Sequence, residues 1–309
     1  MFVDFSQLTV TAAAKVNLHL KVKDKRPDGF HNLESIFLAL DFGDILHFEP
    51  ISGINTVEIN MAKPVFSKSE PKKETELNSI PLQGNIIFKA LSLFRDKTGF
   101  KQGIKIEVEK NIPIGGGLGG GSSDAAAALL ALNEIAGNPL NRDTILDMAG
   151  ELGSDVPFFI YETQAAFISG RGEIIMPIES PCLFFVLVNP GFPSDTAAAY
   201  KLLDEYRNSG KRKDEREINK DVLLHSCFSI SQLSFFFNDF LPVFNEREKS
   251  VYNDIISQLQ ELGADFASLS GAGSTCFGVF RTREAAQNAA EALCDRWPFV
   301  KHCGLRMKL

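Results

Sequence analysis

Two stretches of the chain alternate between hydrophobic and polar residues, which is the pattern of a strand with one buried face. In residues 15–22 the polar positions include Lys15, Asn17 and His19, so these three side chains share one face of the predicted strand. Residues 104–108 repeat the alternation with isoleucine and valine on the buried side. A continuous apolar run predicts a buried strand at 183–188, and a further strand is predicted at 276–280.

Helical periodicity, with its start and stop signals, predicts the helices. Asn85 precedes an apolar-periodic stretch and is expected at or near the N-cap of a helix over 86–94. A second, alanine-rich helix opens at Ser122 and Ser123 and runs to residue 136. Further helices are predicted over 142–152, 251–262 and 284–296.

Several segments between these elements have the composition of loops. Pro-Asp-Gly within residues 26–31 predicts a tight turn from which Phe30 and His31 stand out. Prolines among Lys, Glu and Ser favour a solvated loop or insertion over 61–84, to which we assign no function. The charged stretch 207–220 predicts an exposed loop and a possible boundary between lobes, and the small residues of 268–274 predict another loop.

Composition and charge limit the class of protein. Of the 309 residues, 44% are hydrophobic, which is enough for a sizeable core arranged in two lobes. The formal charge of -7 provides no global positive field to attract nucleic acid or an acidic membrane surface. We therefore expect neither of these partners, and a polyanionic ligand would need a local site.

The cysteines and the first residues indicate a location. The 5 cysteines are odd in number, lie far apart and include no C-x-x-C pair, which argues against a disulfide framework and against a zinc site. An acidic residue, Asp4, stands near the start, no basic region leads into an apolar run, and no long uninterrupted apolar stretch occurs. We expect a cytoplasmic protein that is neither exported nor membrane-spanning.

Residues 113–123 carry the strongest chemical signal, with glycines on both sides of Leu118 and a pair of serines directly before a helix. Such a loop supplies unobstructed backbone N–H groups, two hydroxyls and the positive end of a helix dipole, all of which suit the phosphates of a nucleotide. A flexible linker or hairpin turn is the alternative. A linker, however, does not need a serine pair and an alanine-rich helix immediately after it.

Other phosphate-binding loops fit this segment less well. A P-loop requires Lys followed by Ser or Thr after its last glycine, whereas Gly121 is followed by two serines. Gly115, Gly117 and Gly120 satisfy the G-x-G-x-x-G spacing of dinucleotide-binding proteins. The preceding strand alternates, however, and no acidic residue about 20 positions on ends a second strand. The dinucleotide alternative therefore stays weak.

The loop strongly resembles that of the GHMP kinases, and further motifs occur in the order that this family shows. They are Ala14-Lys15-Val16-Asn17-Leu18, the Pro-Asp-Gly-Phe-His turn, Leu152-Gly153-Ser154-Asp155-Val156-Pro157, Gly170-Arg171-Gly172-Glu173 and Ser270-Gly271-Ala272-Gly273. Together they span residues 12 to 278. The triple glycine on each side of Leu118 resembles in particular the branch that phosphorylates 4-diphosphocytidyl-2-C-methyl-D-erythritol.

This resemblance implies an α+β, two-lobed GHMP-kinase-like fold with the active site in the cleft between the lobes. We place the N-terminal, ATP-binding lobe at 1–164 and the C-terminal lobe at 165–309. The implied activity is that of an ATP-dependent small-molecule kinase with ATP and Mg²⁺ as cofactors. Asp155 would accept the proton of the substrate hydroxyl, and Lys15 would orient that carboxylate and offset negative charge.

The resemblance also implies the nucleotide-binding residues. They are Asn85, Pro113, Ile114, Gly115, Gly116, Gly117, Leu118, Gly119, Gly120, Gly121, Ser122 and Ser123. Mg²⁺ would be shared between the phosphate oxygens and a hydroxyl of Ser122 or Ser123. No carboxylate is assigned to the metal, although Asp124 is the nearest candidate, and no oligomeric state is predicted.

For the acceptor, the resemblance implies a small molecule that bears a cytidylyl group. Phe30 offers a ring for stacking a base, His31 offers donors and acceptors for its edge, and Tyr200 would form a second aromatic wall. The substrate-binding residues are Asn17, Phe30, His31, Tyr200, Ser270, Gly271 and Thr275.

Two alternatives remain: a GHMP kinase for another alcohol such as mevalonate, homoserine or a sugar, and a non-enzymatic nucleotide-binding protein. Phe30 and His31 argue against the first, and retention of Lys15 and Asp155 argues against the second.

Overall fold

The structure is a computed structural model that describes residues 7–54, 57–62, 84–210 and 229–307. Two compact units emerge, and neither is one continuous stretch of chain. The first unit comprises the described parts of Met1–Ala14, Gly43–Ile112 and Gly119–Glu162; the second comprises those of Lys15–Phe42, Pro113–Leu118 and Thr163–Leu309. The lobe limits expected from the sequence stay a prediction.

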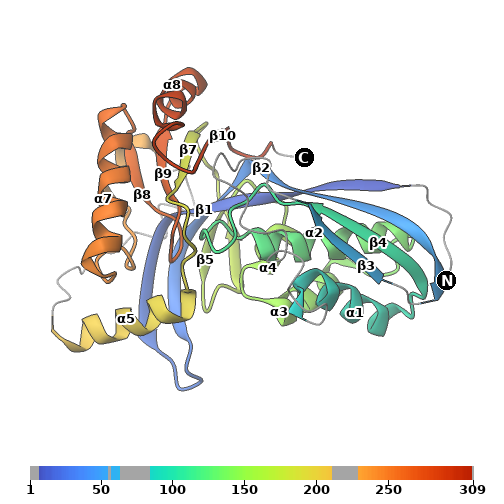
Figure 1. The fold of residues 1–309 in the computed structure, drawn as a ribbon. Coiled ribbons are helices and arrows are strands. Elements are labelled where there is room, and N and C mark those ends of the chain that lie inside the picture. The colour runs from blue at the N-terminus through green and yellow to red at the C-terminus, as the bar shows by residue number, and fades with distance from the viewer. Residues whose placement is uncertain (1–6, 55–56, 63–83, 211–228, 308–309) are drawn as a thin grey trace. The chain divides into compact units, whose positions relative to one another are not determined.

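Strands β1 (Leu8–Lys25) and β2 (His31–Ile54) contribute residues to both units. In the first unit β2 pairs antiparallel with β4 (Gln102–Glu109), which pairs in parallel with β3 (Val57–Ala62). The alternation predicted for β4 is observed, because Ile104, Ile106 and Val108 are fully buried. The helices of this unit pack on one another: α1 (Ile86–Thr98), α2 (Gly120–Ile135), α3 (Arg142–Leu152) and α4 (Val156–Ile160) (Figure 1).

The second unit contains an antiparallel sheet in the order β10-β7-β9-β8. Its strands are β7 (Phe184–Asn189), β8 (Phe266–Leu269), β9 (Cys276–Phe280) and β10 (Phe299–Gly304). Helices α7 (Glu246–Glu261) and α8 (Arg283–Leu293) pack against this sheet (Figure 1). The unit also holds β5 (Ala165–Ser169), β6 (Ile174–Pro177), α5 (Thr196–Asn208) and the 3-10 helix η2 (Ile230–Phe235). The N-terminal half of β2 pairs with β5.

Several elements agree with the sequence prediction to the residue. Helix α3 and strand β9 have the predicted bounds, and Asn85 is the N-cap of α1, its side chain accepting the Ile87 N–H. Among the helices the largest shift at a start is in α7, which begins at Glu246 instead of 251. Neighbouring acidic and basic residues obscured that first turn, although Asn245 caps it.

Other elements differ from the prediction for physical reasons. Strand β1 is longer than 15–22, and β2 was not predicted because acidic residues interrupt its apolar run. Helix α2 starts at Gly120, so the two serines lie in its first turn instead of capping it. Residues 61 and 62 belong to β3, and 207 and 208 belong to α5, so these four residues are not loop as predicted. The parts of the predicted loops at 63–83 and 211–228 lie outside the described residues.

None of the helices in the described part of the chain is long and apolar enough to cross a membrane.

Candidate active site

The glycine loop uses its carbonyl groups to bind the rest of the second unit. The carbonyls of Gly115, Gly116, Gly117 and Leu118 accept hydrogen bonds from Ser194 N–H (2.9 Å), Thr275 N–H (3.1 Å), Ser270 Oγ (2.9 Å) and Lys15 N–H (2.9 Å), respectively. By contrast, the N–H groups of residues 117–122 meet no acceptor among the described residues. The last of them are the first N–H groups of α2, which an α-helix cannot satisfy internally. A row of unpaired donors at a helix N-terminus suits an anion such as phosphate.

Glycine is required in this loop because of close backbone approaches. A Cβ atom at Gly117 would overlap the carbonyl oxygen of Ser270, and one at Gly116 would lie 2.8 Å from Thr275 Oγ1. Gly117 also has a φ of 74°, a conformation that disfavours other residues. The loop at 115–118 and the loop at 270–275 therefore form one rigid assembly within the second unit.

The second loop is supported by two asparagines that the sequence did not single out. Asn189, at the end of β7, donates to Thr275 Oγ1 (3.0 Å), and Asn238 donates to the Gly271 carbonyl (2.8 Å). Ser270 and Thr275 are completely buried. The Ser270 hydroxyl holds the two loops together, whereas Thr275 does so through its backbone N–H and its hydroxyl accepts from Asn189. Contact of either hydroxyl with substrate stays a prediction. Asn238 has no sequence signal, whereas Asn189 stands at the strand-ending Asn-Pro-Gly.

Lys15 and Asn17 lie on a buried face of β1. The Lys15 ammonium donates to Asn17 Oδ1 (2.6 Å) and stands 4.3 Å from the centroid of the Phe37 ring. Asn17 Nδ2 donates to Ser35 Oγ (3.1 Å). The strand was expected to expose its polar face, but residues of β2 cover that face. The Lys15 side chain therefore has a defined position, as is needed for a residue that offsets negative charge at a fixed place.

Asp155 lies in the first unit, at the residue before α4. It is half-buried, and its side chain does not cap that helix. All residues of α4 are buried, so the short helix is firmly anchored. The backbone of Asp155 is thus held in place by the buried helix that follows it.

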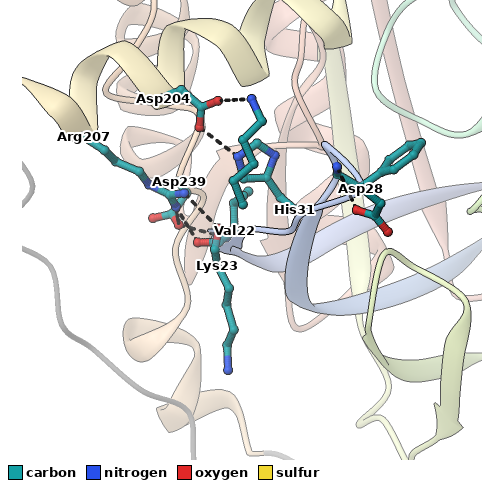
Figure 2. Close-up of polar contacts among 9 residues, drawn as sticks. Val22, Lys23, Asp28, His31, Asp204, Arg207 and Asp239 are labelled. Atoms are coloured by element: carbon teal, nitrogen blue, oxygen red, sulfur yellow. Dashed lines mark hydrogen bonds and ion pairs between the residues drawn. The ribbon is translucent and has the colours of Figure 1, made fainter.

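The turn that precedes β2 presents Phe30 to solvent. Its backbone is closed by the Arg26 N–H, which donates to the Phe30 carbonyl (2.7 Å). Asp28 Oδ1 accepts the Phe30 N–H (3.1 Å) (Figure 2). Gly29 has a φ of 86°, as the predicted tight turn needs. Phe30 is 54% exposed, with the Arg171 guanidinium 5.1 Å from its ring centroid. An exposed aromatic side chain held on a closed turn suits stacking on a planar ligand.

His31 is buried beside this exposed ring. Its Nε2 lies 2.8 Å from Asp204 Oδ1 of α5 (Figure 2). Its ring stacks on Tyr200 with centroids 5.2 Å apart. The structure therefore places Tyr200 and Asp204 on His31, and Asp204 had not been singled out from the sequence. That Phe30, His31 and Tyr200 bind a base together stays a prediction.

Comparison with known proteins identifies the family. The descriptions "GHMP kinases N terminal domain" and "GHMP kinases C terminal" match residues 85–163 and 222–298. A protein of Thermodesulfovibrio yellowstonii named 4-diphosphocytidyl-2-C-methyl-D-erythritol kinase is 34% identical, covering 94% of this chain and 95% of its own length. The chain belongs to the GHMP kinase family.

Further relatives agree with this assignment. A Chloroherpeton thalassium protein of the same name is also 34% identical, over 94% of this chain and 95% of its own. A crystal structure of 4-(cytidine 5'-diphospho)-2C-methyl-D-erythritol kinase matches with a TM-score of 0.75 and 28% identity, covering 97% of this chain and 100% of that one. Homoserine kinase from Cytophaga hutchinsonii, at 18% identity and a TM-score of 0.66 over 98% of this chain and 95% of that one, shares the fold. The predicted two-lobed α+β fold is confirmed, and this GHMP kinase is an ATP-using phosphotransferase.

The first unit of this GHMP kinase contains a buried charge cluster that sequence reasoning missed. Lys110, just after β4, forms ion pairs with Asp44 and with Asp124 (2.7 Å to the latter). Asp44 Oδ1 also accepts the N–H groups of Asn111 (2.6 Å) and Ile112 (2.8 Å). Two acids and a lysine scattered over 80 positions of sequence gave no pattern that could reveal this.

Asp124 is therefore a structural carboxylate, bound to Lys110 in the interior of the first unit. Burial raises its pKa to about 7; Lys110 acts to lower the pKa, and Asp44 raises it further. Within the part of the chain that the structure describes, its Oδ1 has no hydrogen-bond partner. No group of three or more His, Cys, Asp or Glu side chains arranged to hold a metal occurs among the described residues.

Proposed function

We propose that this GHMP kinase transfers the γ-phosphoryl group of ATP to the 2-hydroxyl of 4-diphosphocytidyl-2-C-methyl-D-erythritol, in the non-mevalonate route to isoprenoid precursors. The observation that carries the proposal is the match, across nearly the whole chain, to relatives that bear this name. The exposed Phe30 ring beside a fixed histidine supports it, because a cytosine needs both a stacking surface and polar edge contacts. The proposal includes a cytoplasmic location, which the odd number and wide spacing of the cysteines support.

The glycine loop is the proposed phosphate site. The N–H groups of residues 117–122 would bind the ATP phosphates, and Asn85, which caps α1, would lie at the nucleoside. The half-buried hydroxyl of Ser122 in the first turn of α2, or that of Ser123, provides the oxygen ligand that Mg²⁺ prefers. A bound Mg²⁺ would offset the negative charge of the phosphates.

In the proposed reaction the substrate hydroxyl oxygen forms a bond to the γ-phosphorus, and the bond from that phosphorus to the bridging oxygen breaks. The electron pair leaves with ADP, and the hydroxyl proton passes to Asp155. Lys15, which Asn17 holds in a fixed position, would offset the negative charge. Because the transition state is loose, we expect placement of charge to contribute more than early proton removal.

The test is ADP release with ATP and Mg²⁺ in the presence of 4-diphosphocytidyl-2-C-methyl-D-erythritol. Asp155→Asn should lower kcat by about 10²–10⁴-fold, as loss of a general base does. Asp147→Asn, an exposed acid on α3, is the matched control and should retain full activity. A fully active Asp155→Asn enzyme would remove Asp155 from the mechanism.

An acceptor panel tests the substrate. Mevalonate, homoserine and galactose should give no more ADP than the reaction without acceptor, because none of them has a base to stack on Phe30. Turnover with one of these alcohols and not with the cytidylyl substrate would overturn the acceptor assignment while leaving the kinase assignment in place.

A further inference from the structure

Asp204 of α5 joins both ends of the turn that carries Phe30. Its Oδ1 lies 2.8 Å from Nε2 of His31, the first residue of β2. Its Oδ2 accepts a hydrogen bond of 3.0 Å from Lys25, the last residue of β1. One carboxylate thus fixes the residues on both sides of the turn (Figure 2).

Helix α5 restrains the His31 ring from a second direction. Tyr200 stands four positions before Asp204, so both side chains lie on one face of the helix. Its ring stacks on His31 at an interplanar angle of 20° and packs edge-on against Phe240, with centroids 4.9 Å apart. The imidazole is therefore held both at its edge and on its face.

The helix itself is anchored near its C-terminus. Arg207 donates to the backbone carbonyls of Val22 and Lys23 in β1 (3.0 Å for Lys23), and it pairs with Asp239 at 3.3 Å (Figure 2). The position of Asp204 is therefore well defined, because its own hydrogen bonds hold the carboxylate and Arg207 anchors the helix that carries it.

The location of the proton on His31 follows from this geometry. Burial acts to raise the pKa of Asp204, but hydrogen bonds from Lys25 and His31 lower it on balance, so the carboxylate is ionised near neutral pH. An ionised carboxylate only accepts hydrogen bonds, so Nε2 must carry the proton that it donates. In the neutral ring, Nδ1 then presents a lone pair.

We propose that Asp204 is a positioning residue that sets base specificity: by fixing the ring and the Nε2–H form of His31, it makes Nδ1 an acceptor for an exocyclic amine. Cytosine offers such an amine, whereas uracil has a carbonyl oxygen at the same place, which would face the lone pair. The inference rests on the proposed function, because it assumes that a pyrimidine binds at Phe30 and His31.

The experiment compares kcat/KM for the cytidylyl substrate and for its uridylyl counterpart. In Asp204→Asn the side chain can present either an amide donor or a carbonyl acceptor, so His31 is no longer restricted to one form. The preference for cytidylyl over uridylyl should fall about tenfold or more, as expected on loss of a hydrogen bond to a charged group. The KM for ATP should not change.

Two controls separate this role from a general effect on the fold. Asp195→Ala removes the N-cap of the same helix, where Asp195 accepts the Ala198 N–H, and should lower Tm without changing base preference. In a His31→Ala background, Asp204→Asn should have no further effect on that preference, because Asp204 acts through His31.

Three outcomes would overturn the inference: an unchanged base preference in Asp204→Asn, an equal change in Asp195→Ala, or a full effect of Asp204→Asn without His31. Failure of the wild-type enzyme to phosphorylate the cytidylyl substrate would instead overturn the proposed function itself, and so can be told apart from them.

Discussion

Two carboxylate clusters, one in each unit, use the same chemical groups in different surroundings. In the first unit, the side chains of Asp44, Lys110 and Asp124 are at most 5% exposed. In the second unit, the side chain of Lys25 is 56% exposed and that of Asp204 is 26% exposed. Both clusters hold an acid with a lysine, but only the first does so away from water.

The difference determines what each cluster can do. A buried ion pair cannot lose one partner without leaving an uncompensated charge in a low-dielectric interior, so the group acts as a unit. A partly exposed pair is screened by water and contributes little to stability. We infer that the buried cluster maintains the first unit, whereas a change in the partly exposed cluster can shift His31 without endangering the fold.

The largest expected effect comes from Lys110→Met. Removal of the ammonium leaves two buried acids without a counter-charge, which should cost about 3–5 kcal/mol in the free energy of unfolding. Urea denaturation measures this cost. Lys105→Met, which removes a surface ion pair with Glu107 on β4, is the control and should change stability little. If Lys110→Met had the same free energy of unfolding as the control variant, the prediction would be contradicted, and the cluster would have to be accessible to water.

A pH series sharpens the comparison at Asp124. Its pKa, about 7 in the folded protein, lies above the value of about 4 expected in the unfolded chain. The proton therefore binds the native state more tightly. This contribution to stability is fully present below about pH 4 and is lost as the pH rises through 7.

Asp124→Asn removes that titration and keeps an oxygen that can accept from Lys110. The unfolding free energy of the wild type minus that of Asp124→Asn should therefore decrease between pH 5 and pH 8 in urea titrations. Asp147→Asn, at an exposed position, should give a constant difference. A difference for Asp124→Asn that is independent of pH, or that increases with pH, would contradict the raised pKa.

The smallest effect is expected for Lys25→Met in the exposed cluster. Asp204 would lose its outer partner and keep its contact with His31, so the KM for the cytidylyl substrate should rise no more than about threefold, in line with a screened surface pair. Lys23→Met, two residues earlier, breaks a different pair with Glu34 and should leave that KM unchanged. A tenfold rise for Lys25→Met would indicate that this cluster is not screened as its exposure implies.

Local patterns in the sequence predicted much of the fold. Helix α3 and strand β9 were predicted to the residue, because capping residues and apolar periodicity are encoded within a few positions of each element. Strand β2 was not, since Asp41 and Asp44 interrupt its apolar run, and both acids are bound by distant partners. Asp41 accepts the Gly304 N–H, more than 250 positions away.

In the candidate site, too, locally encoded features were predicted and features that depend on tertiary contacts were not. The glycine loop was evident from composition, because glycines before a helix have few other uses. Its support by Asn189 and Asn238, and the clamp of Asp204 on His31, depend on side chains that only the tertiary fold brings together. That both faces of β1 are buried over 12–22 was not predicted for the same reason, because alternation shows that a strand has two faces but not what covers the polar one.

The packing of the glycine loop has a consequence for the descent of the enzyme. A side chain at Gly117 would meet backbone oxygens of Ser270 and Gly273, and no exchange of a neighbouring side chain can move a peptide carbonyl. At Gly121 the nearest atom that a Cβ would meet among the described residues, outside its own helix backbone, is a side-chain atom of Ile86 at 4.0 Å. Lineages of this enzyme should therefore accept alanine at 121 where the nucleotide allows it, whereas position 117 should stay glycine even in lineages whose residues around it have all changed.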